Sequence, residues 1–172
     1  KYQKLTNEKL PEQIADLIAQ QKVIGWFQGR MEFGPRALGS RSILGDARSS
    51  EMQKNLNLKV KYRESFRPFA PSVLSEDLSE WFELNDSSPY MLMVANIHRN
   101  KIIEMSEKEK KLFGIAKLNV KRSEIPAVTH VDYSARIQSV NSKINPLYYS
   151  LLDAFYKKYN CAVIINTSFN IR

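Results

Sequence analysis

Three arginines and three glycines lie close together in GRMEFGPRALGSRSIL, residues 29–44. The arginines are Arg30, Arg36 and Arg41, and they do not alternate with acidic residues as charges on a surface helix usually do. Glycine lets a backbone approach a ligand closely, and arginine offers a planar fork of donors that matches phosphate or carboxylate oxygens in pairs. The segment therefore predicts a long ordered loop that forms an oxyanion cradle. It is not a Walker loop, because the G-x-x-x-x-G-K-[ST] spacing is absent.

A second cationic segment, KVKYRESFRPFAP, follows at residues 59–71. Odd positions share one face of a strand, so the spacing allows up to four cations to point into one cleft. These cations are Lys59, Lys61, Arg63 and Arg67. The alternative is an edge strand that carries lysines to resist aggregation. We favour the cleft because the neighbouring Phe66, Pro68 and Phe69 are typical of packed residues.

Two later segments also place polar side chains beside apolar strands. Arg136 lies inside ARIQSV, and a buried arginine needs an anionic partner. Asp132 is one candidate, which would make a structural pair, and a ligand is the other. The segment NTSFN follows a buried strand, where ligand sites of α/β proteins commonly open. Its polar residues are Asn166, Thr167, Ser168 and Asn170.

Histidine and cysteine offer little chemistry in this chain. His98 and His130 lie far apart, and neither has a cysteine or carboxylate at metal-ligand spacing, so no metal site is expected. The single Cys161 stands beside AVII and is expected to be a buried structural thiol. No Ser-His-Asp or Cys-His arrangement and no RNA-recognition signature is present.

Positive charge is concentrated in one part of the chain. The formal net charge of the 172 residues is +8, and residues 30–67 hold six Arg and three Lys against four acidic residues. Concentrated positive charge predicts an anionic partner, such as phosphate esters, nucleic acid or an acidic surface. A solvated basic face is the alternative that composition leaves open.

Periodicity predicts helices and strands without regular βα alternation. This mixture favours an α/β (α+β-like) fold, a twisted mixed sheet with helices packed on it, over a doubly wound parallel sheet. Helices are expected over 8–21, from Ser50 (capping-box spacing to Gln53), after Ser75, and from Asn145-Pro146. Strands or extended segments are expected over 22–28 (buried on both sides), 66–74, 90–97, 127–131, 135–140 and 162–169.

The chain length suits one domain over residues 1–172, with residues 99–124 as a charged surface excursion. The polar start and the abrupt, strand-like end predict a piece cut from a larger protein. No apolar run approaches the ~18 residues that a membrane helix needs. No signal-peptide pattern is visible, and the lone cysteine is typical of a reducing compartment, so a cytoplasmic protein is expected.

Six segments, taken in order, resemble the carboxy-terminal domain of the carbamoyltransferases, the family of the nodulation-factor and antibiotic O-carbamoyltransferases. They are GRMEFGPRALGSRSIL, KYRESFRPFAPSVL, SPYML, AVTHVDYSARIQSV, NPLYYSLLDAF and INTSFN. The resemblance runs from about residue 22 to residue 172 and is weakest over 99–124. In that family a Gly-Glu-Pro stretch follows the basic residue that corresponds to Arg172, and its absence here agrees with a truncated chain.

The resemblance implies a YrdC-like fold and a reaction divided between two domains. The YrdC-like domain would join carbamoyl phosphate and ATP, which brings Mg²⁺ with it, into carbamoyl adenylate. A preceding metal-containing domain, outside this sequence, would pass the carbamoyl group to an acceptor hydroxyl. The expected partners are therefore the two small molecules and the amino-terminal domain of the same polypeptide, without a membrane. The isolated fragment need not be active.

Carried over motif by motif, the resemblance also implies roles for individual residues. The phosphate of carbamoyl phosphate would be held by Arg36, Lys61 and Arg67. The carbamoyl or nucleotide groups would be contacted by Arg136, Arg172, Thr167, Ser168 and Asn170. The catalytic set would be Lys61, Arg67 and Arg136. Arg30 and Arg41 are secondary candidates, and their alternative role is structural pairing with Glu32 and Asp46.

Two other classes of function remain open at this point. One is a basic nucleotide- or RNA-binding module, which predicts salt-dependent RNA binding. The other is a docking domain without catalysis, which predicts arginines on an open surface. The carbamoyltransferase hypothesis instead requires Arg36, Lys61, Arg67 and Arg136 to meet around one cavity.

Overall fold

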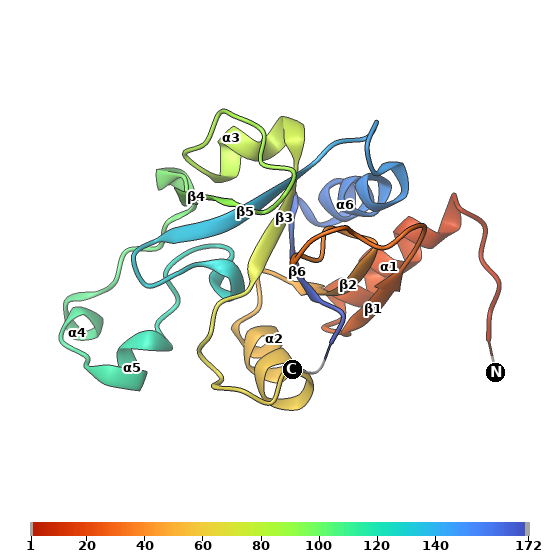
Figure 1. Cartoon of the computed structure of the whole chain (residues 1–172). Helices are drawn as coiled ribbons and strands as arrows, with labels where there is room; N and C mark the ends of the chain where they lie inside the picture. The colour runs from red at the N-terminus through yellow and green to blue at the C-terminus, as the bar shows by residue number, and fades with distance from the viewer. Residues whose placement is uncertain (1, 171–172) are drawn as a thin grey trace.

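A computed structural model describes residues 2–170, and its centre is one six-stranded sheet (Figure 1). The order of the strands across the sheet is β1-β2-β6-β3-β5-β4. Their bounds are β1 Ile24–Phe27, β2 Arg41–Asp46, β3 Ala70–Leu74, β4 Met93–Asn96, β5 Ser134–Val140 and β6 Val163–Ser168. β3 pairs with β5 in parallel, and the other neighbouring pairs are antiparallel. The prediction of a mixed sheet with helices packed on it is confirmed.

Helices cover both faces of this sheet. They are α1 Lys9–Ala19, α2 Ser50–Asn55, α3 Leu78–Trp81, α4 Glu107–Lys110, α5 Gly114–Leu118 and α6 Pro146–Tyr159. α1 and α6 lie side by side, tied by an ion pair of 2.6 Å between Lys158 and Asp16 (Figure 1). α6 covers the face to which Ser72 points, and α2 covers the opposite face, where Met52 packs against Gly45. The register places Ser72 and Gly45 on opposite faces, because they pair with the adjacent residues 164 and 165 of β6.

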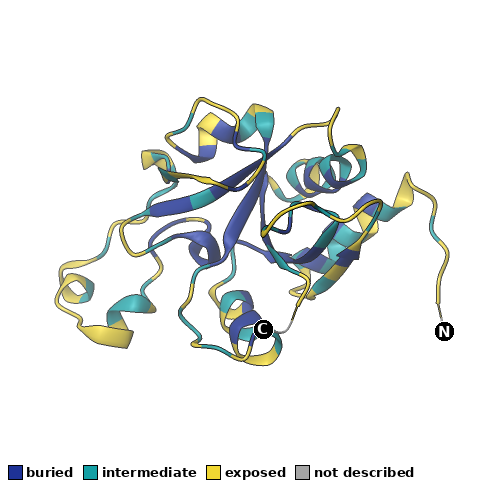
Figure 2. Cartoon of the chain, in the orientation of Figure 1, coloured by how far each residue is buried: buried dark blue, intermediate teal, exposed yellow. Residues whose placement is uncertain are grey.

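The longest helix, α6, shows how the sequence specifies an element. Pro146 occupies its first turn, where a missing N–H costs nothing, and Asn160 ends it in the left-handed conformation at φ 52°. Its buried face holds Tyr148, Leu151, Leu152 and Phe155. Figure 2 shows the same pattern across the molecule, with the central strands buried and the segment that carries α4 and α5 largely exposed.

Four local predictions are wrong. Residues 41–46 form the buried strand β2 inside the expected loop, because Gly45 fits against Met52 and the charge of Asp46 is neutralised by Arg48. Residues 22–28 contain only a four-residue edge strand in which Trp26 alone is buried. Residues 126–128 form a 3₁₀ turn rather than a strand. The cap of α2 is Ser49, whose side chain accepts a bond from the N–H of Met52.

The expected strand over residues 59–67 is also absent. α2 continues instead as a π-helical turn over Leu56–Val60, and the N–H of Lys61 still bonds to the carbonyl of Leu56. The chain then reverses at Tyr62, which has a φ of 48°. Residues 59–67 therefore do not alternate between two faces as they would in a strand, and the odd spacing of their cations does not place those side chains on one face.

Residues 99–124 extend away from the sheet as short helices and turns (Figure 1). A bridge between Ile102 and Ser123 closes the base of this excursion. Arg122 is buried there, and its guanidinium donates to carbonyls at the end of α5, including those of Leu118 and Val120. Within residues 2–170, no helix is both long and apolar enough to cross a membrane.

Candidate anion-binding site

A cavity of about 190 Å³ opens where β5 and β6 meet the loop between β1 and β2. Its lining comes from residues 35–37 of that loop, Arg63, residues 68–70, Met91, the start of β5 and the end of β6. Its polar lining consists of Arg36, Arg63, Arg136, Asn166, Thr167 and Ser168. Segments more than a hundred residues apart in the sequence thus contribute donors to one hollow.

Arg36 and Arg136 line this cavity, and neither forms an ion pair with an acidic side chain of residues 2–170. The Nε atoms of both guanidinium groups are buried and have no hydrogen-bond partner among residues 2–170. Burial, and then the nearby charge of Arg36, lowers the pKa of Arg136. An unpaired buried donor costs free energy, and two like charges repel, so both costs would be relieved by an anion between the two side chains.

Arg63 adds a third guanidinium from a different element. Its Nε donates to Oδ1 of the buried Asn57 at 2.6 Å, and its guanidinium carbon lies 4.8 Å from the centroid of the Phe69 ring. Burial lowers the pKa of Arg63, the charge of Arg67 lowers it further, and Glu64 opposes the shift. These contacts fix the side chain at the wall of the cavity.

The loop that carries Arg36 is held by buried polar side chains of the sheet. Three consecutive carbonyls, those of residues 37–39, accept hydrogen bonds from Asn166 Nδ2 at 3.0 Å, Gln138 Nε2 at 2.9 Å and Trp26 Nε1 at 2.8 Å. Glu32 fixes the same loop from within, because its Oε1 accepts the N–H groups of residues 38, 40 and 41. Burial raises the pKa of Glu32, but these backbone bonds outweigh it and leave the pKa below its usual value.

A buried polar row continues below this loop. Tyr148 donates to Ser72 Oγ at 2.9 Å, and Ser72 donates to Gln138 Oε1 at 2.6 Å, which also accepts from Asn166 Nδ2 at 2.8 Å. The donor side of Asn166 is therefore fully used, whereas its buried Oδ1 has no partner among the described residues. Asn166 lines the same cavity as Arg36 and Arg136.

Gly39 is required where the loop crosses α6. Its φ is +99°, and a Cβ at this position would lie 2.3 Å from the Tyr148 ring. Only glycine combines this conformation with so close an approach. Gly39 thus lets the loop that carries Arg36 pack directly against the Tyr148 ring.

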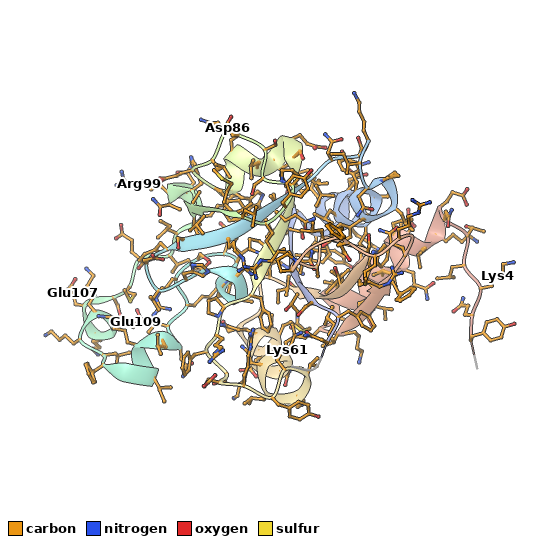
Figure 3. The ribbon with its side chains drawn as sticks, in the orientation of Figure 1. Lys4, Lys61, Asp86, Arg99, Glu107 and Glu109 are labelled. Carbon is orange, nitrogen blue, oxygen red and sulfur yellow. The ribbon has the colours of Figure 1, made fainter. Side chains whose placement is uncertain are left out.

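The structure places Lys61 beside the cavity wall rather than in it. Its side chain is buried next to α2 (Figure 3), and Nζ lies within 2.6–3.2 Å of four oxygens, the carbonyl and side-chain oxygens of Ser168 and Asn170. Burial, and then the charge of Arg63, lowers the pKa of Lys61 to about 8. Lys61 therefore fixes the end of β6, which lines the cavity, and through it places Asn170.

Arg67 lies on the surface outside the cavity lining, so of the four cations expected around one cavity only Arg36 and Arg136 line it. Its Nε pairs with Glu64 at 2.7 Å, and both side chains are about half exposed. Its carbonyl accepts a bond of 2.8 Å from Asn57 Nδ2, the residue that also orients Arg63. The sequence pattern contained Arg63, but the residue was not carried into the expected site, whereas Arg67 was.

Arg30 and Arg41 lie outside this cavity. Arg30 lines a separate cavity of about 360 Å³ on the other side of the loop. The guanidinium of Arg41 donates to the carbonyls of residues 28 and 40 and lies 3.5 Å from the centroid of the Phe27 ring. The alternative of pairing with Glu32 and Asp46 is not observed, since Asp46 pairs with Arg48 and Glu32 accepts backbone N–H groups.

The other expected contacts divide into three groups. Thr167 and Ser168 line the cavity. Arg172 lies outside the described residues. Asp132 does not pair with Arg136, because its Oδ1 accepts the N–H and hydroxyl of Ser134. Among residues 2–170, no group of three or more His, Cys, Asp and Glu side chains is arranged to hold a metal ion.

Residues 15–172 match the family described as Carbamoyltransferase C-terminus. The chain is 54% identical over 171 residues to the uncharacterized protein sll1178 of Synechocystis sp., with 99% of this chain and 28% of that protein covered. It is 44% identical over 167 residues to the nodulation protein NolO of Bradyrhizobium diazoefficiens, with 95% and 27% covered. It is 37% identical over 157 residues to the 3'-hydroxymethylcephem-O-carbamoyltransferase of Streptomyces clavuligerus, with 91% and 26% covered.

The chain therefore belongs to the carbamoyltransferase C-terminus family, as the resemblance of its segments predicted. Its relatives include a protein named as an O-carbamoyltransferase. The chain spans only about 28% of the length of the first of these relatives and 27% of the second.

Proposed function

We propose that this domain binds carbamoyl phosphate and ATP at the arginine-lined cavity and converts them into carbamoyl adenylate. A separate preceding domain would then transfer the carbamoyl group to an acceptor hydroxyl. The observation that carries the proposal is that Arg36 and Arg136 line one cavity and that the buried Nε of each has no hydrogen-bond partner among residues 2–170. Fixed donors of this kind favour a bound phosphate without reorganising during the reaction.

Asn166 supports the choice of carbamoyl phosphate over other phosphates. Its Oδ1 is a buried acceptor without a partner among residues 2–170, and the residue lines a cavity whose charged lining residues are arginines. The carbamoyl group carries an NH₂ that donates hydrogen bonds. Bound between the arginines and Asn166, the phosphate would accept from the guanidinium groups and the amine would donate to Oδ1.

The volume of the cavity limits what can enter it. About 190 Å³ suits a small phosphate ester, whereas a drug-sized ligand fills a pocket of roughly 300–1,000 Å³. We therefore place carbamoyl phosphate inside the cavity and the nucleoside of ATP outside it. Thr167 and Ser168, at the end of β6, would lie between the two substrates. Lys61 and Asn170 would fix this strand end, and Arg67 would add positive charge from the nearby surface.

The reaction balances with one molecule of water. Attack of water on carbamoyl phosphate would release hydrogen phosphate and one proton to the solvent and leave carbamate, whose oxygen would attack the α-phosphorus of ATP. The bond from that phosphorus to pyrophosphate then breaks. The protein would mainly position the reactants and neutralise charge, so a general base has little to do. Mg²⁺ would enter with ATP as part of the substrate.

The proposal is tested with the full-length protein by carbamoyl-phosphate-dependent exchange of labelled pyrophosphate into ATP. We expect exchange with carbamoyl phosphate and little with acetyl phosphate, which has a methyl group in place of the amine. Loss of discrimination in an Asn166→Ala variant would support the role of Oδ1. Absence of any carbamoyl-phosphate-dependent exchange by the wild-type protein would refute the proposal.

A further inference from the structure

One face of the sheet is uncovered at the β1 edge. Gly25 and Phe27 of this strand lie on the face opposite to the buried Trp26, and Val23, which is 40% exposed, directly precedes the strand. The Phe27 side chain is 69% exposed. On the neighbouring strand β2, the same face is covered by α2, where Met52 packs on Gly45. The helical layer therefore ends before it reaches β1.

The uncovered aromatic side chains are nevertheless held in place. Phe169 lies across β1, with its ring 3.2 Å from the position that a Cβ of Gly25 would occupy. Its ring meets that of Phe27 edge-on, with 6.4 Å between centroids. Arg41 stacks its guanidinium on Phe27 while donating to backbone carbonyls of the adjoining loop. We call this cluster of Val23, Gly25, Phe27, Arg41 and Phe169 the β1 patch.

Apolar exposure continues into the loop beyond the patch. Met31 is 73% exposed, and the side chain of Phe33 is fully exposed. Single exposed apolar residues are common on protein surfaces, but ordered aromatic clusters with an arginine are typical of interaction surfaces. The β1 patch combines these features at an open sheet edge.

We infer that the β1 patch is the surface on which the preceding domain of the same polypeptide docks. The identity of this occupant rests on the division of the reaction between two domains under "Proposed function". Almost the whole of this chain aligns with two relatives, but the alignment covers only 28% and 27% of their lengths. The family is described as the carbamoyltransferase C-terminus. The amino end and β1 lie on the same side of the molecule, away from α4 and α5 (Figure 1).

The position of Phe169 connects this surface to the cavity. Phe169 directly follows Ser168, which lines the cavity and is bonded by Lys61. A domain docked on the β1 patch would therefore contact the strand end beside the bound substrates. This placement shortens the path of the carbamoyl group to its acceptor and excludes water from a reactive adenylate.

Thiol labelling of the full-length protein tests the inference without requiring activity. We compare a Phe27→Cys variant with an Ile115→Cys control in α5, where the native side chain is 62% exposed, and follow each introduced thiol by peptide mass spectrometry. Cys161 should stay unlabelled, because it is buried and burial raises its pKa to about 12. We expect the thiol of the Phe27→Cys variant to react about tenfold more slowly than that of the Ile115→Cys control, as expected for a side chain inside an interface.

Two outcomes overturn the inference. Equal labelling rates in the two variants would show that nothing covers the β1 patch. Protection of the thiol in the Phe27→Cys variant that disappears on dilution would show that a second copy, rather than the preceding domain, occupies the patch. Both results are independent of pyrophosphate exchange, so they are distinguishable from failure of the proposed chemistry.

A second variant, Phe27→Asp, adds a functional readout. We expect transfer of the carbamoyl group to the acceptor to fall about tenfold, since a charge would enter an apolar interface, while pyrophosphate exchange is retained. Unchanged transfer in this variant would contradict the docking surface.

Discussion

Arg48 and Arg136 are both partly buried arginines near the sheet, but within residues 2–170 only Arg48 has a charged partner. Arg48 donates to both carboxylate oxygens of Asp46, at 2.9 Å and 2.7 Å. These hydrogen bonds raise the pKa of Arg48 despite its burial. Arg136 has a buried Nε without a partner among residues 2–170, and burial followed by the charge of Arg36 lowers its pKa.

We interpret Arg48 as a structural charge and Arg136 as a charge that binds a ligand. A paired arginine stabilises the folded chain mainly by neutralising the charge beside it, so its removal exposes that charge. An unpaired arginine beside a like charge costs folding free energy and is retained where it serves binding. The two residue types are identical, and only their neighbours distinguish them.

The largest effect is expected from Arg136→Leu in the full-length protein. Removing one fixed donor from the charged centre should lower carbamoyl-phosphate-dependent pyrophosphate exchange about 10²–10³-fold. The free energy of unfolding, measured with urea, should be unchanged or higher, because a buried unpaired charge is lost. Near-normal exchange in this variant would end the distinction between Arg136 and Arg48.

A second effect is expected at the loop that positions Arg36. Gly39→Ala should lower the free energy of unfolding by about 2–4 kcal/mol, through backbone strain and the clash with Tyr148. Gly29→Ala is the matched control, since Gly29 also has a positive φ but no atom within 4 Å of the added Cβ. The control should cost about 1–2 kcal/mol. Equal losses in urea titrations would mean that the loop is not fixed at Tyr148.

Arg48→Ala should show the opposite pattern to Arg136→Leu. Loss of the ion pair leaves Asp46, which is 1% exposed, with only neutral partners. Because Arg48 itself is one-third exposed, we expect a loss of about 2 kcal/mol rather than the full cost of a buried pair. Pyrophosphate exchange at a temperature well below the unfolding transition should be unchanged. A large loss of pyrophosphate exchange in Arg48→Ala at that temperature would contradict a purely structural role for Arg48.

The smallest effect concerns Lys61, a buried cation that has neutral oxygen partners. Its pKa is about 8 in the folded protein and about 10.4 in an unfolded chain. Between these values the unfolded chain binds more protons, so the free energy of unfolding gains a contribution that rises with pH. Below pH 8 that gain is absent. Urea titrations between roughly pH 7.5 and 10.5, which span these two pKa values, should show this rise in the wild-type protein relative to Lys61→Met. Equal dependence of the free energy of unfolding on pH in the two proteins would contradict it.

Much of the fold is visible in the sequence. Asn145-Pro146 predicts the start of α6, and the apolar run before NTSFN predicts β6, because both signals are local. β2 was missed since its buried Gly45 and Asp46 depend on Met52 and Arg48, which only the folded chain brings to them. The cavity arginines Arg36 and Arg136 were expected from residue type, but their shared cavity depends on loop residues 37–39 bonding to β5, β6 and Trp26.

The family, the mixed sheet and the dense positive charge near residues 30–67 can all be inferred from the order of the amino acids. Tertiary structure alone decided that Arg63 lines the cavity while Arg67 pairs with Glu64 on the surface. The physical reason is the π-helical turn before Lys61 and the positive φ of Tyr62, which break the two-residue alternation of a strand. Residue type sets which ligand a side chain can bind, and the path of the backbone sets whether it can reach one.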